Sequence, residues 1–238
     1  KLKMRNNLFK ILIIMLLVGF LTAFSFVKNE NRNIDFENIN FIDSDLKFIS
    51  LDSVNKLLKQ SDLLSNKFLK SDLNLKEIEQ KFLDNTFIHS AEVSLGLDGQ
   101  LGIILKEKNP VFRVLNDNYY IDSDGNKMSL SNLFSERIPL LLNKVDSSYF
   151  NKLGLLGEYI KNDMFLSKHI IALSQFEEDL NFYVNGYSYV LKIEKFDNYK
   201  TKFKNYENLF RSVYNEGLLD SLSSINLNFK NQVIVQKK

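Results

Sequence analysis

The sequence contains no cysteine. This absence excludes disulfide bonds, thiolate catalysis and cysteine-based zinc sites. The folded part must therefore be stabilised by ordinary hydrophobic cores. A chain of 238 residues that is 45% hydrophobic is long and apolar enough to form one or two of them.

Basic residues are scarce outside the N-terminal tip. The first 27 residues carry Lys1, Lys3, Arg5 and Lys10 and no acidic residue. The remaining 27 basic residues face 29 acidic ones, so the rest of the chain has a net charge near −2. A nucleic-acid-binding protein is expected to carry a basic stripe on its folded part. The charge totals therefore disfavour nucleic acid as a partner.

Catalytic and metal-binding motifs are also missing. His89 and His169 are the only histidines and have no HExxH partner, so each is interpreted as a surface or partly packed side chain. No GxSxG motif is present. Asp122–Asn126 resembles part of a calcium loop, but Tyr120 and Ser131 stand where acidic ligands are required, so a turn is predicted instead. We therefore expect no catalytic residue, metal ligand, cofactor or small-molecule substrate.

One long apolar run, Leu8–Val27, stands out. Twenty helical residues span about 30 Å, the thickness of a bilayer core. Its Leu, Ile, Val and Phe residues favour insertion by about 4–7 kcal/mol. We predict a transmembrane helix at 8–27, a cytoplasmic tip at 1–7 and the rest of the chain outside, by the positive-inside rule. A cleaved signal peptide is the alternative, because Ala23-Phe24-Ser25 is an acceptable cleavage site.

Residues 34–108 have the pattern of a small mixed domain. A strand is predicted near Ile34–Ile42, followed by a helix capped by Ser50 or Asp52. A second helix begins at Asn74, which forms a capping-box-like pair with Glu77. The apolar stripe of this second helix consists of Leu75, Ile78, Phe82 and Leu83.

Two alternating stretches follow these helices. They flank Asp98-Gly99, a strong hairpin turn, and Pro110 is predicted to end the second strand. Each strand has one apolar face, which the two helices can cover. The order strand, helix, helix, strand, strand is that of a POTRA module, a small docking domain found outside membranes.

Residues 109–238 are rich in strand patterns. Strands are predicted at Val111–Leu115, at Tyr119–Ile121, at 137–142 and on both sides of Asn185-Gly186. Helices are predicted at 149–161 and at 199–213, the latter with Tyr199, Phe203, Tyr206, Phe210 and Val213 on one face. The predicted fold class is α+β: a transmembrane helix, a POTRA-like βααββ domain and a β-rich domain with flanking helices.

The last predicted strand, Val233–Val235, lies close to the end of the chain. Little of the sequence remains to cover it, so we expect an edge strand whose free N–H and C=O groups form a template for a partner strand. The alternative is that this strand simply closes the sheet. The polar residues around it resemble those that prevent promiscuous pairing: Gln232, Gln236, Lys237 and Lys238.

Together these features resemble the FtsQ/DivIB cell-division family. The resemblance covers nearly the whole chain and is sharpest over residues 74–142. There the stretches "LNLKEIEQKFLDNTFIHSAEVSLGLDGQLGIILKEKNPVFRV", "YYIDSDGNKMSLS" and "RIPLLL" look like the version of the family found in Bacteroidota-type bacteria. Ser129 and Asn143 depart from it, where relatives often have proline and glycine.

The resemblance implies a non-enzymatic, single-pass scaffold of the cell inner membrane with most of its chain in the periplasm. Such a scaffold binds FtsB- and FtsL-like bitopic proteins, acts with the septal peptidoglycan synthase complex and helps control septal peptidoglycan synthesis. Its POTRA unit is implied to serve recruitment to the septum. The alternatives are a membrane-anchored envelope hydrolase and another POTRA-bearing envelope protein.

The resemblance also implies where the partner binds. A strand of FtsB is added to the last strand of the β domain, and Phe229 occupies the place of an aromatic contact residue. Asn228 stands where some relatives have arginine. The implied partner-binding residues are Leu227, Asn228, Phe229, Lys230, Asn231, Gln232, Val233, Ile234 and Val235.

Overall fold

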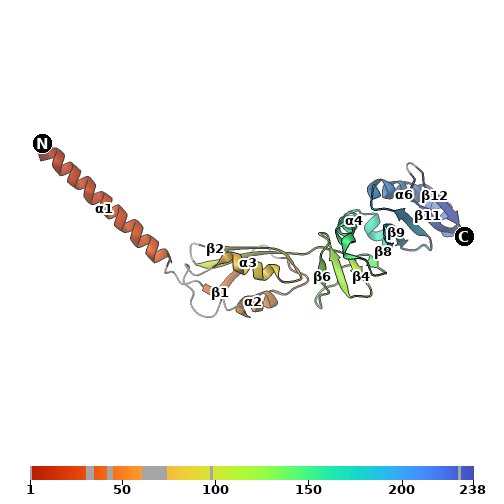
Figure 1. Cartoon of the computed structure of the whole chain (residues 1–238), viewed down its shortest axis with the longest axis horizontal. Coiled ribbons are helices and arrows are strands. Elements are labelled where there is room, and N and C mark those ends of the chain that lie inside the picture. Colours follow the sequence, from red (N-terminus) through yellow and green to blue (C-terminus); the bar gives the residue numbers. More distant parts are fainter. Residues whose placement is uncertain (1, 31–34, 42–44, 61–73, 97–98, 230–231) are drawn as a thin grey trace. The chain divides into compact units, whose positions relative to one another are not determined.

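The computed structural model describes residues 2–30, 35–41, 45–60, 74–96, 99–229 and 232–238. The chain divides into two compact units, Lys1–Lys106 and Glu107–Lys238 (Figure 1). The assignment of separate roles to residues 34–108 and 109–238 stays a prediction.

The chain begins with a long helix, α1 (Leu2–Glu30). Its segment Lys10–Lys28 is long and apolar enough to cross a membrane, and none of that segment is buried inside the protein. An apolar helix that packs against no protein core is what a bilayer-spanning segment requires. Among the described residues, this is the single helix with that character.

The first unit continues with a small mixed sheet. Its elements are β1 (Asp35–Phe41), α2 (Leu51–Gln60), α3 (Leu75–Leu83), β2 (Ile88–Leu95) and β3 (Gln100–Glu107). They follow the predicted order of strand, helix, helix, strand, strand. The sheet order is β1-β3-β2, with β1 parallel to β3. Side chains from both helices meet the sheet in one core, which includes Val54, Leu58, Ile78, Phe82, Leu101 and Ile103.

The predicted helix caps are confirmed in one case and wrong in the other. The Ser50 hydroxyl accepts the N–H of Ser53 at 3.1 Å, as an N-cap does. Asn74 is the N-cap residue of α3, but its side chain makes no capping bond, so the predicted capping box does not form. Leu83 is 40% exposed, although we expected it in the buried stripe. It follows Phe82 directly and is therefore rotated about 100° away from the buried face.

The second unit is built on a nine-stranded sheet in the order β12-β11-β10-β9-β8-β7-β4-β5-β6. Neighbours pair in parallel at β4–β7, β7–β8 and β10–β11 and antiparallel elsewhere. The strands are β4 (Pro110–Val114), β5 (Tyr119–Asp122), β6 (Lys127–Ser129), β7 (Leu140–Leu141), β8 (Ile170–Phe176), β9 (Asp179–Val184), β10 (Val190–Glu194), β11 (Leu222–Asn226) and β12 (Ile234–Lys237).

Helices pack on this sheet and complete one large core. They are α4 (Phe150–Asn162), α5 (Leu166–His169) and α6 (Tyr199–Val213), with short 3-10 turns η3 (Ser147–Tyr149), η4 (Tyr214–Glu216) and η5 (Leu218–Ser221). The core takes alternate residues from the strands and apolar faces from α4 and α6. The predicted helices at 149–161 and 199–213 and the α+β fold class are thus confirmed.

Several predicted strands differ from the observed ones. Pro110 does not end a strand but begins β4, where its missing N–H breaks no ladder. The strand expected at 137–142 is reduced to Leu140–Leu141. The central strand β8 was not predicted, and neither was β6.

A close approach fixes α4 against β4. A Cβ added to Gly157 would lie 2.7 Å from both Val111 and Phe112. Only glycine leaves space for this contact, because any side chain would overlap the neighbouring atoms. Gly157 therefore sets the distance between the helix and the sheet.

Candidate partner-binding edge

The strand β12 lies at the end of the nine-stranded sheet, beside β11 only (Figure 1). The two strands run antiparallel, with Ile234 opposite Asn226 and Val235 opposite Ile225. Within the described part of the chain, the other side of β12 pairs with no strand. The prediction of an edge strand is therefore confirmed, with the bounds Ile234–Lys237 in place of Val233–Val235. That this edge binds a partner, rather than simply closing the sheet, stays a prediction.

The main-chain bonds between β11 and β12 fix which groups of β12 face β11. The N–H of Lys238 donates to the carbonyl of Ser221 at 2.9 Å, so Lys238 faces β11. In-plane direction alternates along a strand, and Gln236 and Ile234 therefore face β11 as well. The Ser223 hydroxyl does not distinguish the two directions, since it donates to the carbonyls of both Gln236 at 3.1 Å and Lys237 at 3.2 Å.

The same alternation turns Val235 and Lys237 the other way. The N–H and C=O groups of Val235 and the N–H of Lys237 point out of the sheet, where an added strand can bond to them. The carbonyl of Lys237, in contrast, accepts the hydroxyl of Ser223. Val235 lies opposite Ile225, a core residue, so its side chain is on the face that the helices cover. It is nevertheless 42% exposed, because the sheet ends there.

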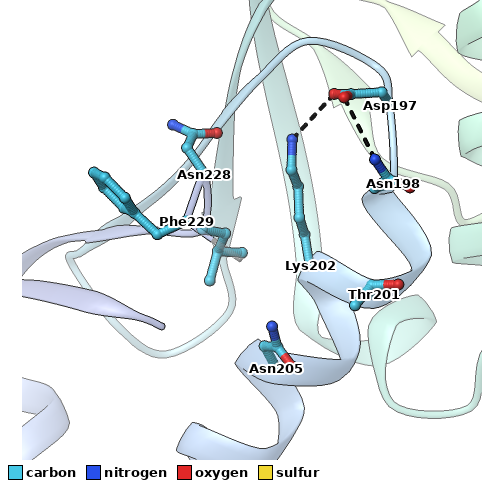
Figure 2. A pocket seen from close by; sticks show the side chains of 8 residues that line it. Asp197, Asn198, Thr201, Lys202, Asn205, Asn228 and Phe229 are labelled. Atoms are coloured by element: carbon cyan, nitrogen blue, oxygen red, sulfur yellow. Dashed lines mark hydrogen bonds and ion pairs between the residues drawn. The ribbon is translucent and has the colours of Figure 1, made fainter. Parts of the chain in front are cut away.

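A pocket of about 340 Å³ lies where β11 ends and α6 begins. Figure 2 shows the α6 side chains on one side of it and Asn228 and Phe229 on the other. Phe229 is 47% exposed. The residues that line the pocket are Asp197, Asn198, Thr201, Lys202, Asn205, Leu227, Asn228 and Phe229.

Some of the polar side chains that line the pocket already have bonding partners within the protein. Lys202 Nζ lies 3.3 Å from Asp197 Oδ1 and donates to the Glu194 carbonyl at 3.0 Å. The hydrogen bond from Lys202 is the main reason why the pKa of Asp197 is lowered. The opposite charges of Lys202 and Asp197 therefore offset each other in the wall of the pocket.

Asn228, which also lines the pocket, has one hydrogen-bond donor without an acceptor in the described part of the chain. Its Oδ1 accepts the N–H of Glu194 at 2.6 Å, which holds the end of β10 against the β11–β12 connection. Its Nδ2 is buried and has no hydrogen-bond partner among the described residues. A buried unpaired donor costs stability, and an acceptor on a bound chain would satisfy it.

The structure brings most of the implied partner-binding residues to one end of the sheet. Leu227, Asn228 and Phe229 line the pocket, and Ile234 and Val235 lie on β12. Gln232 and Val233 precede that strand, and Val233 packs partly on the core. Lys230 and Asn231 lie outside the described residues. Leu227 is 2% exposed and therefore forms the floor of the pocket rather than a contact surface.

Sequence reasoning missed the α6 side of the pocket. Lys202 and Asn205 stand on the polar face of an amphipathic helix, and nothing in their spacing separates them from solvated residues. The outward direction of Lys237 was also missed, because it depends on the register of β12.

His169 is not the surface or partly packed residue that we expected. It is 8% exposed, and its Nε2 is hydrogen-bonded to the hydroxyl of Tyr206. The Tyr206 hydroxyl lies 2.7 Å from that of Tyr189. Burial lowers the pKa of His169 from 6.5 to about 4 and raises that of Tyr189 to about 12. His89 is exposed, as predicted.

The segment Asp122–Asn126, which resembles part of a calcium loop, has a structural role. Asp122 Oδ1 accepts the N–H groups of Asp124 at 3.0 Å and Asn126 at 2.7 Å, so this segment is a turn, as predicted. In the described part of the chain, no group of three or more His, Asp or Glu side chains is placed to hold a metal ion. The hydrogen bonds of His169 described above join it to a tyrosine rather than to a serine or an aspartate.

Comparison with known proteins gives one family match. Residues 109–236 match the family described as "FtsQ/DivIB, C-terminal related". The major extracytoplasmic domain of the cell-division protein DivIB from Geobacillus stearothermophilus is 11% identical, with a TM-score of 0.35 over 46% of this chain and 97% of that one. This likeness is too remote to carry an argument, and no curated protein matches the sequence. Since the family match covers more than half of the chain, the protein belongs to the FtsQ/DivIB C-terminal related family.

Proposed function

We propose that this protein is a non-enzymatic scaffold of the division machinery, which binds FtsB- and FtsL-like bitopic proteins through β12. Membership of the FtsQ/DivIB family implies a role in cell division and partners within the division complex. The proposal adds the identity of these partners, their site, and control of septal peptidoglycan synthesis through the synthase complex.

The observation that carries the proposal is the free edge of β12 beside a pocket. Main-chain groups of an edge strand bind an extended partner segment, and nearby pockets select its side chains. The exposed ring of Phe229 and the buried floor at Leu227 give the pocket its apolar part. Aromatic residues in such positions commonly provide much of the binding energy.

The membrane helix supports the same proposal. The apolar segment Lys10–Lys28 within α1 would hold the chain in the inner membrane, with residues 1–7 in the cytoplasm and 34–238 in the periplasm. Anchoring partners in one membrane raises their effective concentration, so an edge of few residues suffices for binding. Residues 34–108 would then serve recruitment, and residues 109–238 partner binding.

Co-purification tests the proposal. The full chain, in detergent, is expected to retain the FtsB-like protein encoded in the same genome. Phe229→Ala removes an exposed aromatic contact and should weaken retention by about tenfold or more. Leu133→Ala is the matched control, because Leu133 is also an exposed apolar residue, at 63%, but follows β6 at the opposite edge of the sheet.

Two results would contradict the proposal. One is a wild-type chain that retains neither the FtsB-like nor the FtsL-like protein. The other is a cell that divides normally after the protein is depleted. Either result would favour the alternative of another POTRA-bearing envelope protein.

A further inference from the structure

We infer that the partner segment bonds to the main chain of Val235 and Lys237, placing an apolar residue beside Val235 and an acidic residue beside Lys237. This inference rests on the proposed function and deepens it by specifying the chemistry of the partner strand.

The first step concerns the backbone. Lys238 faces β11, as its 2.9 Å bond to Ser221 requires, and residues at even spacing from it share that direction. The outward groups of β12 are therefore the N–H and C=O of Val235 and the N–H of Lys237, because the Lys237 carbonyl accepts the Ser223 hydroxyl at 3.2 Å. An added segment can therefore bond to the main chain of these two residues. Such main-chain bonding requires a short extended partner segment, because the main-chain groups of a helix are already bonded within the helix.

The second step concerns the side chains of the same two residues. Residues two apart on a strand share a face, so Lys237 lies on the helix-covered face together with Val235. Val235 is 42% exposed although its opposite neighbour Ile225 is fully buried. The partner residue beside Val235 would cover this apolar surface, and an apolar side chain gains most from doing so.

The third step concerns charge. Among the described residues, Lys237 forms no ion pair, whereas the neighbouring Lys238 donates its Nζ to the Asp220 carbonyl at 2.7 Å. An exposed lysine on an edge strand repels a basic residue directly across from it and attracts an acidic one. The edge thus selects a partner strand with an acidic residue two positions from the apolar one.

The experiment uses the full chain in detergent and an array of peptides that tile the extracytoplasmic segments of the FtsB- and FtsL-like proteins. The captured peptide is expected to contain an apolar and an acidic residue two positions apart. Val235→Pro removes the outward N–H but leaves the β11–β12 bonds intact, and should weaken capture by about tenfold or more. Val235→Ala keeps the N–H and should weaken capture by less.

Charge reversal tests the acidic position. Lys237→Glu should weaken capture by about fivefold at low salt, and this difference should shrink at high salt. Lys168→Glu is the matched control, because Lys168 is an exposed lysine on α5 and the change in net charge is the same. It should leave capture unchanged.

The outcomes separate the inference from the proposed function. Loss of capture with Val235→Pro but unchanged capture with Lys237→Glu would keep β12 as the site and overturn the acidic residue. Unchanged capture with a folded Val235→Pro chain would overturn the backbone assignment. If the wild-type chain captures neither peptides nor intact partners, the proposed function and this inference both fail.

Discussion

Lowering the pH should destabilise the second unit through one buried side chain, His169. This ring stacks on Phe165 with centroids 4.8 Å apart and meets the edge of Phe210 at 4.8 Å. Its hydrogen-bond partner is the hydroxyl of Tyr206, which is itself buried and bonded to Tyr189. Aromatic rings and tyrosine hydroxyls solvate an imidazolium ion poorly, so the folded state holds His169 neutral.

The size of the effect follows from the pKa of His169, which burial lowers from 6.5 to about 4. Above pH 6.5 the His169 ring is neutral in both the folded and the unfolded chain, so the unfolding free energy does not depend on its titration. As the pH falls from 6.5 towards 4, the unfolded chain binds a proton that the folded chain does not. The unfolding free energy therefore falls, by about 2 kcal/mol at pH 5 and about 3 kcal/mol below pH 4.

Tyrosine fluorescence during urea unfolding provides the assay. The sequence has no tryptophan, and all 10 tyrosines lie between residues 119 and 214, so the signal reports on the second unit. Wild type and His169→Gln are compared at about pH 7.5 and about pH 5. The wild type should lose about 2 kcal/mol more than the variant between these conditions.

The comparison with His169→Gln isolates the buried ring, because both proteins carry the same acidic groups, whose titration affects both equally. Equal losses for wild type and His169→Gln would refute the reasoning, because they would mean that the folded protein protonates His169 readily.

Two further predictions concern packing and membrane insertion. Gly157→Ala should lower the unfolding free energy by about 1–3 kcal/mol, because its Cβ would lie 2.7 Å from Val111 and Phe112. Leu155→Ala on the exposed face of the same helix is the control, and equal unfolding curves for both variants would contradict the close contact. Deletion of residues 1–30 should release the protein from membranes into the soluble fraction. The full chain should stay in the membrane pellet after extraction with alkaline carbonate, and immunoblots of the pellet and the soluble fraction would measure both results. A full chain that carbonate extracts would refute the span.

Elements with a strong apolar period could be predicted from the sequence. The spacing of Tyr199, Phe203 and Tyr206 gave the bounds of α6 as the structure has them. The stripe of α4 was predicted equally well, because Leu153, Leu156 and Ile160 face a single core. In both helices, local periodicity and tertiary packing point to the same face.

Elements that depend on distant partners could not be predicted. The central strand β8 contains Ser174 and Gln175, which break an apolar run and are nevertheless buried. Asn143, 32 residues away, holds the main chain of Gln175 in place, since its Oδ1 accepts the N–H of Gln175 at 2.9 Å and its Nδ2 donates to the Gln175 carbonyl at 2.5 Å. His169 is a similar case, because the hydroxyl that satisfies it comes from Tyr206, 37 residues later.

The residues of the candidate site also divide into those that could be predicted from the sequence and those that could not. The strand β12 was predicted from the alternation near the end of the sequence, whereas the resemblance to the family implied the pocket residues Leu227 to Phe229. Lys202 and the direction of Lys237 were not, because they depend on how α6 crosses the sheet and on the register with β11. Sequence reasoning thus identifies the edge, and the structure determines which of its groups are free.

Residue-resolved hydrogen exchange of β12 tests the central claim most directly. In the free protein, the amides of Ile234 and Gln236 should be protected by β11, and those of Val235 and Lys237 should exchange freely. Adding the FtsB-like partner should slow exchange at Val235 and Lys237 and leave Ile234 and Gln236 unchanged. A partner that binds while Val235 and Lys237 continue to exchange freely would contradict strand addition at this edge.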